Sequence, residues 1–135
     1  MLIKLKPVYL NMLFKIIVSI GLLFAIGLFV FLPVDLVTSY SITAILVLGG
    51  IIYSFYLNRN EVLIIKSDSE KIEFSFVNNS IFKRKEVKLT ISEIAAVRKG
   101  EFLALSNHEH LFAVVRKKAI TTTEWDELLV LLKVY

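Results

Sequence analysis

Cysteine is absent from the 135 residues of this chain. Its absence excludes a disulfide framework, a thiolate metal site and a cysteine nucleophile. Other signatures of reaction chemistry are missing as well, since the chain has no phosphate-cradling glycine loop, no nucleophile elbow and no paired His–Glu zinc helix. We therefore expect no enzymatic activity, no cofactor and no small-molecule substrate.

Charge is missing from two long apolar runs near the N-terminus, residues 16–34 and 37–57. Each run has about 20 residues, and a helix that rises about 1.5 Å per residue crosses the ~30 Å hydrocarbon layer of a bilayer at this length. The mean hydropathy of the chain, +0.71, is also too high for an ordinary soluble domain of this size. The sequence therefore predicts a transmembrane helical hairpin within residues 1–57.

The two runs contain no residue that could carry a proton or an ion. Asp35, which lies in the short connection between them, is the one acidic, basic or histidine residue from position 16 to position 57. Because ionisable groups at membrane depth mark ion and proton paths, their absence argues against a transporter or pump. Small residues on the runs allow close helix contact, either inside the hairpin or between copies in a homo-oligomeric pore; these residues are Gly21, Ala25, Gly50 and Ser54.

Basic residues flank the hairpin at its two outer ends. Lys4, Lys6 and Lys15 precede the first run and Arg59 follows the second, whereas the connection has no base. Since cytoplasmic segments are enriched in Lys and Arg, we expect a multi-pass protein of the inner (cytoplasmic) membrane with its N-terminus and C-terminal domain in the cytoplasm. A cleaved secretory signal is the alternative for the first run, but no small-x-small cleavage site follows it.

Residues 58–135 have charges every few positions and predict one small β domain. Ile72, Phe74 and Phe76 alternate with polar residues, and so do Val87 and Leu89, which is the period of a half-buried strand. We expect strands at residues 61–66, 72–76, 86–91, 95–99, 102–106 and 111–116. Six or seven strands in succession predict a meander in a small barrel or sandwich, and the fold class is therefore a membrane-anchored α+β protein.

The last part of the chain changes to a helical period. Trp125, Leu128, Leu129 and Leu132 fall at i, i+3, i+4 and i+7, so they share one face of a helix. Two capping pairs precede or begin this segment, Thr121 with Glu124 and Thr123 with Asp126. We expect this C-terminal helix to cover one opening of the β structure.

The order of these elements resembles the bacterial pleckstrin-homology-like proteins. The resemblance covers residues 61–135, and its most specific parts are the segment LTISEIAAV at residues 89–97 and the segment EWDELL at residues 124–129. It implies a seven-stranded, strongly bent β structure plugged by a C-terminal helix, which serves as a binding or assembly module without catalysis. The basic signature that reads phosphoinositides in eukaryotic relatives is not present, so specificity for inositol lipids is not implied.

Two basic clusters are candidate contact sites for anionic lipid headgroups or for a partner, with about 1 kcal/mol per residue expected near a membrane surface. The alternative is a solvated surface that only contributes to the orientation in the membrane. Residues 58–135 contain 13 basic and 11 acidic residues, which argues against nucleic acid as a ligand. The clusters comprise Lys83, Arg84, Lys85 and Lys88 in one, and Arg116, Lys117 and Lys118 in the other.

His108 and His110 flank Glu109 in a predicted turn and could supply two nitrogen ligands, but no third ligand is identifiable, so we expect a turn and no metal.

The expected function is that of a non-enzymatic, membrane-anchored binding or scaffolding protein, a small accessory subunit of a larger inner-membrane complex. Its partners would be membrane lipid and other integral membrane subunits, or further copies of itself. A peripheral sensor of anionic lipid and a homo-oligomeric pore are the alternatives.

Overall fold

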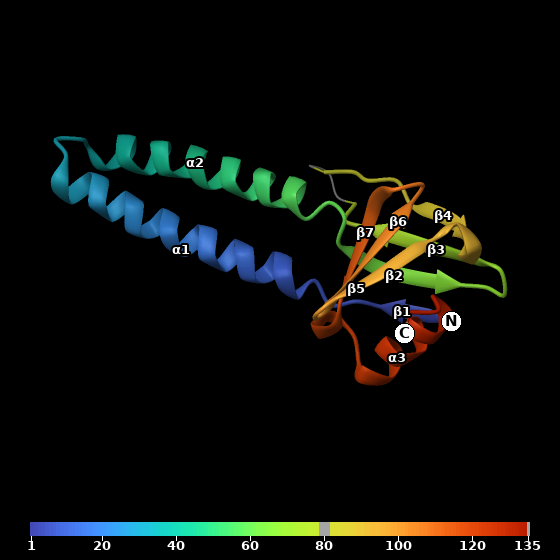
Figure 1. The fold of residues 1–135 in the computed structure, drawn as a ribbon. Coiled ribbons are helices and arrows are strands. Elements are labelled where there is room, and N and C mark those ends of the chain that lie inside the picture. Colours follow the sequence, from blue (N-terminus) through green and yellow to red (C-terminus); the bar gives the residue numbers. More distant parts are fainter. Residues whose placement is uncertain (79–81, 135) are drawn as a thin grey trace. The chain divides into compact units, whose positions relative to one another are not determined.

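The computed structural model describes residues 1–78 and 82–134, and it divides into two compact units. One unit is the helical hairpin, Tyr9–Asn58. The other, called the β-unit below, joins the N-terminal segment Met1–Val8 to Arg59–Tyr135. Figure 1 shows that the hairpin is inserted into the chain of the β-unit between its first and second strands.

The hairpin consists of α1 (Val8–Phe31) and α2 (Leu36–Leu57). Two stretches, Leu13–Phe31 and Leu36–Leu57, are long and apolar enough to cross a membrane, with mean hydropathies of 2.6 and 1.8. This confirms the two expected apolar helices with shifted bounds. The first ends at Phe31 instead of residue 34 because the residue before Pro33 disfavours the helical conformation. The second begins one residue earlier because Asp35 caps it, accepting a hydrogen bond from the Thr38 N–H at 3.2 Å.

The two helices of the hairpin pack through their small residues. The Ser39 hydroxyl on α2 donates a hydrogen bond to the Ala25 carbonyl on α1 at 2.9 Å, and both side chains are buried. A Cβ at Gly21 would collide with the side chain of Val47, and one at Gly50 would lie 3.3 Å from Ile17 Cγ2. Gly21, Ala25 and Gly50 therefore serve close packing inside the hairpin.

We expect Gly21→Leu to loosen the hairpin, at a cost of about 1–3 kcal/mol for an overpacked contact. Gly27→Leu is the matched control on the same helix, because nothing lies within 4 Å of a Cβ built at Gly27. Since the chain has no native cysteine, the rate of disulfide formation between Ala25→Cys and Ser39→Cys measures the contact directly. Equal rates of disulfide formation in the Gly21→Leu and Gly27→Leu variants would contradict this packing.

The β-unit contains seven strands in two antiparallel sheets among its described residues. The four-stranded sheet has the order β1-β2-β3-β4 and the three-stranded sheet the order β5-β6-β7. The strands are β1 (Leu2–Lys4), β2 (Val62–Ser67), β3 (Lys71–Phe76), β4 (Val87–Thr90), β5 (Ala95–Lys99), β6 (Phe102–Asn107) and β7 (His110–Arg116). All six expected strands are present.

The two sheets do not close into a barrel, which corrects one of the two architectures expected. Between β4 and β5 the chain forms a short 3₁₀ helix, η1 (Ile91–Glu93), with a capping box in which Glu93 accepts bonds from the Thr90 N–H and hydroxyl. These bonds lower the pKa of Glu93. Among the described residues, Glu61, which directly precedes β2, forms an isolated parallel bridge with Val114 on β7, and no continuous ladder joins the two sheets. The general α+β class is confirmed.

The C-terminal helix α3 (Thr122–Leu131) forms where its period predicted it. Its N-terminus has the expected capping box of Thr121 and Glu124, whose hydrogen bonds lower the pKa of Glu124. Trp125 and Leu128 are almost completely buried in the core of the β-unit. The helix therefore packs its buried face against the core of the β-unit, although the open sheets have no barrel opening for it to cover.

Strand β1 is an addition to the elements that the sequence predicts, since the sequence places residues 1–57 in the hairpin. It pairs antiparallel with β2, with Ile3 opposite Ile65. Ile3 is 1% exposed and Leu5 is 7% exposed, and both belong to the same hydrophobic cluster as Trp125. The residues that precede α1 thus complete the core of the domain that follows α2.

Candidate interaction surfaces

Arg84, at the centre of the first basic cluster, is held inside the β-unit. Its guanidinium donates hydrogen bonds to the Arg59 carbonyl at 2.6 Å, to the Phe112 carbonyl at 2.7 Å and to the side-chain oxygen of Asn60. It also lies 3.9 Å from the ring centroid of Phe76, which is a cation–π distance. Burial, and secondly the charge of Arg59, lower the pKa of Arg84. Arg84 therefore joins β7 and β3 to the segment that follows α2.

The other members of the first cluster are more open to solvent. Lys83, Lys85 and Lys88 are exposed. Lys88 lies opposite Glu73 on β3, with 3.8 Å between Nζ and Oε2. Lys83 and Lys85 are thus the side chains of this cluster best placed to contact a ligand.

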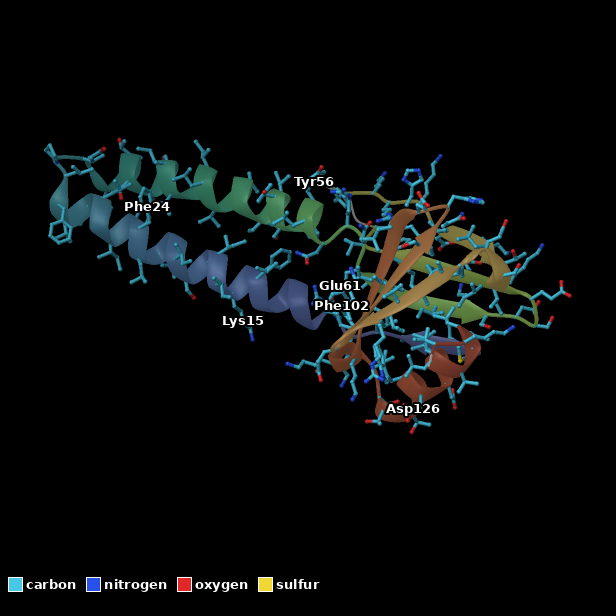
Figure 2. All side chains as sticks on the ribbon, in the orientation of Figure 1. Lys15, Phe24, Tyr56, Glu61, Phe102 and Asp126 are labelled. Atoms are coloured by element: carbon cyan, nitrogen blue, oxygen red, sulfur yellow. The ribbon has the colours of Figure 1, made fainter. Side chains whose placement is uncertain are left out.

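Arg116, the first member of the second cluster, is paired with a buried acid. Its Nε lies 4.0 Å from Oε1 of Glu61, whose side chain is 6% exposed. Neither carboxylate oxygen of Glu61 accepts a hydrogen bond from the residues that the structure describes. Figure 2 labels Glu61, which directly precedes β2, at the end of the β-unit where the parallel bridge to β7 lies. Desolvation raises the pKa of Glu61, and the charge of Arg116 opposes this rise.

The buried Glu61 gives the β-unit a defined dependence on pH. A carboxyl whose pKa is higher in the folded than in the unfolded chain holds its proton more tightly when folded. Its stabilising contribution is therefore complete below the unfolded value, about 4.3, and is lost as the pH rises through the raised folded value. We expect the difference in unfolding temperature between wild type and Glu61→Gln to change as the pH rises from about 4.3 through the raised folded pKa of Glu61. A difference that stays constant with pH would contradict the raised pKa.

The segment that carries Lys117 and Lys118 is hydrogen-bonded to the backbone of Lys6, which lies far away in the sequence. The short 3₁₀ helix η2 (Lys117–Ala119) follows β7, and the Lys6 N–H donates a hydrogen bond to the Ala119 carbonyl at 2.9 Å. Lys6 and Lys118 are exposed, and Lys117 is half-buried. Lys6 also lies two residues before the start of α1. From the sequence, Lys6 contributes only to the expected orientation in the membrane, because no local sequence pattern predicts a contact between residues so far apart.

The His108 region forms a tight turn between β6 and β7. His108 and Glu109 have φ values of 48° and 67°, which are left-handed conformations typical of a two-residue hairpin turn. Within the residues that the structure describes, no group of three or more His, Cys, Asp or Glu side chains could hold a metal ion. The arrangement is that of a hairpin turn.

Comparisons with protein-family models, with curated proteins and with solved structures returned no match to this chain.

Proposed function

We propose that this chain is a non-enzymatic, membrane-anchored binding and scaffolding protein, an accessory subunit of a larger complex in the inner membrane. One observation carries the proposal: the apolar hairpin is inserted between β1 and β2. The β-unit is therefore attached to membrane helices through two short connections, residues 5–7 and 58–61. A chain extends by at most about 3.6 Å per residue, so such connections keep the β-unit within reach of partners at the membrane surface.

The pairing of β1 with β2 also supports the proposed orientation. Paired strands lie on the same side of a membrane, so a hairpin between them crosses the bilayer an even number of times. The basic residues at both outer ends of the hairpin favour the cytoplasm for that side.

The arrangement of the β-unit supports the resemblance to pleckstrin-homology-like domains. The resemblance implies seven strongly bent strands plugged by a C-terminal helix. The β-unit has four- and three-stranded antiparallel sheets followed by α3. Under this proposal the domain is a pleckstrin-homology-like binding module with a membrane hairpin in the connection between its first two strands.

Purification of the tagged full-length chain from its native membrane in mild detergent tests the proposed function. We expect integral membrane proteins to co-elute at a fixed stoichiometric ratio. Ile3→Asp, which places a charge in the core of the β-unit, is expected to lose them, whereas Leu2→Asp on the exposed side of β1 is expected to retain them. Recovery of the wild-type chain alone would contradict the accessory-subunit proposal, and equal recovery with both variants would assign the binding to the hairpin.

A sensor of anionic lipid is a second candidate, favoured by the backbone hydrogen bond from Lys6, directly before α1, to Ala119 in η2, the segment that carries Lys117 and Lys118. Each base near an anionic surface contributes about 1 kcal/mol, so three together would retain headgroups selectively. We expect the triple change of these residues to Glu to reduce the anionic phospholipid that remains bound after delipidation. Lys66→Glu with Lys71→Glu, two exposed bases elsewhere, is the control. Equal lipid retention in both variants would exclude this candidate.

A further inference from the structure

Residues 59–61, called the strap below, belong to the connection between α2 and β2 and lie beside β7. The Val114 N–H on β7 donates a hydrogen bond to the Asn60 carbonyl at 2.7 Å, and Glu61 forms the isolated parallel bridge with Val114. Since β7 is the last strand of its sheet, this contact lies on the edge that does not pair with β6. The strap therefore covers part of an edge strand that is otherwise open to pairing.

A second set of contacts holds the strap through Arg84. Its guanidinium donates hydrogen bonds to the Arg59 carbonyl and the Asn60 side chain in the strap, and to the Phe112 carbonyl on β7. Amide and guanidinium groups do not titrate between about pH 4 and about pH 8. These contacts therefore hold the strap equally well across that range of pH.

Glu61 is the residue of the strap that can titrate in this range. It is 5% exposed, and its two carboxylate oxygens accept no hydrogen bond from the described part of the chain. Its charged partner on β7 is Arg116, with 4.0 Å between Nε and Oε1. An ionised carboxylate in such a site has lost its hydration without gaining donors, whereas a neutral carboxyl group loses much less. The closed strap therefore favours the protonated form of Glu61.

The charged groups on the elements around Glu61 are basic. Arg116 belongs to β7, Arg84 to the segment before β4, and Arg59 to the strap itself. Nearby positive charge favours the ionised form of a carboxyl group. Burial nevertheless outweighs the attraction of Arg116 and raises the pKa of Glu61. Ionisation of Glu61 therefore disfavours the closed position of the strap.

We propose that the strap is a pH-dependent latch, which is closed on β7 while Glu61 is protonated and opens locally when Glu61 ionises. Opening lets water hydrate the carboxylate and breaks the hydrogen bond between Val114 and Asn60. The opening ends at the next residue, because Val62 is 1% exposed and belongs to the core cluster. Such a local opening requires much less free energy than the unfolding of a whole domain.

Opening of the latch uncovers the outer edge of β7. The Val114 N–H then has no acceptor in the strap and can pair with an extended segment of another chain. This consequence rests on the proposed function, in which the β-unit binds partners at the membrane surface. Under that proposal, the pH on the side of the β-unit controls whether a partner strand can reach β7.

Hydrogen exchange of the full-length chain in mild detergent, followed by NMR between about pH 4 and about pH 8, tests the latch. The protection factor, which is the ratio of the intrinsic to the observed exchange rate, removes the direct effect of pH on exchange. We expect the protection of the Val114 amide to fall as the pH rises, by about tenfold for each unit by which the pKa of Glu61 is raised. Low concentrations of urea are expected to leave this protection unchanged, since local opening exposes little surface.

The Val115 amide is the matched control in the same strand. Because N–H groups alternate between the two sides of a strand, it faces Leu103 on β6. We therefore expect Val115 to exchange through unfolding, with higher protection than Val114 and a clear dependence on urea. In Glu61→Gln, whose side chain cannot ionise, the protection of Val114 is expected to be independent of pH.

Two results would overturn the latch. If Val114 showed the same urea dependence as Val115, the strap would open only when the β-unit unfolds. If the protection of Val114 fell with pH in Glu61→Gln as it does in the wild type, a different group would control the opening. The exchange measurement involves no partner, so neither result bears on the accessory-subunit proposal, which the co-purification tests separately.

Discussion

Replacement of Ile3 by aspartate is expected to unfold the β-unit, although Ile3 is separated from the rest of the unit in the sequence by the apolar hairpin. The side chain is 1% exposed in the core cluster. Truncation of a buried isoleucine to alanine costs about 2–5 kcal/mol. A buried carboxylate without a partner adds several kcal/mol to this loss, and a domain of this size is stable by only about 5–15 kcal/mol. We expect Ile3→Ala to lower the free energy of unfolding by about 3 kcal/mol and Ile3→Asp to abolish cooperative unfolding.

The fluorescence of Trp125 measures this effect without a label. It is the single tryptophan of the chain and is 1% exposed in the same cluster. Urea unfolding of the full-length chain in mild detergent, followed by this signal, reports on the β-unit. Leu2→Asp is the matched control, since Leu2 neighbours Ile3 on β1 and is 56% exposed; we expect a change within about 0.5 kcal/mol. Similar unfolding curves for the two aspartate variants would show that β1 is not part of the folded domain.

Arg84→Met is expected to destabilise the β-unit by about 2–4 kcal/mol. The change removes three hydrogen bonds from a charged donor and the contact with Phe76. Hydrogen bonds of charged groups contribute about 1.5–3 kcal/mol each, and the loss is less than their sum because the exposed Arg59 carbonyl regains water. Arg84→Lys is expected to restore little of the lost stability, since the ammonium group of lysine cannot replace the planar set of N–H donors of the arginine guanidinium.

Lys83→Met is the control for this prediction, because Lys83 is the neighbouring base in the same cluster and is exposed. Both variants lose one positive charge, so a purely electrostatic role in lipid binding predicts equal effects for the two. The structural role predicts a lower urea midpoint for Arg84→Met and an unchanged midpoint for Lys83→Met. Equal midpoints would contradict the structural role of Arg84.

The elements that the sequence predicted correctly are those whose burial follows a local period. Phe74 and its alternating neighbours define β3, and Trp125 with Leu128 defines the buried face of α3. The apolar helices were equally evident from the absence of charge. In each case the residues that determine the element lie within a few positions of one another.

The features that the sequence did not reveal depend on contacts between distant residues. β1 has only three residues, too few for a period, and its partner strand lies beyond the whole hairpin. Arg84 looked equivalent to Lys83 and Lys85 because its acceptors are mostly backbone carbonyls, which no side-chain pattern signals. The barrel alternative is wrong because the 3₁₀ helix η1 and its capping box at Thr90 and Glu93 end the strand run between the two sheets, which the alternating pattern of residues 86–91 does not signal.

The position of the hairpin between β1 and β2 also sets an order of events during synthesis. Under the proposed membrane anchoring, residues 2–4 leave the ribosome before both helices and have no partner strand until the helices have been made and inserted. If the second helix failed to return across the bilayer, Ile3 and Ile65 would be separated by the membrane and the core would stay open. If the hairpin spans the membrane as proposed, completion of the four-stranded sheet depends on correct insertion, and only a chain with both helices inserted acquires a complete core that resists the proteases that remove unfolded chains.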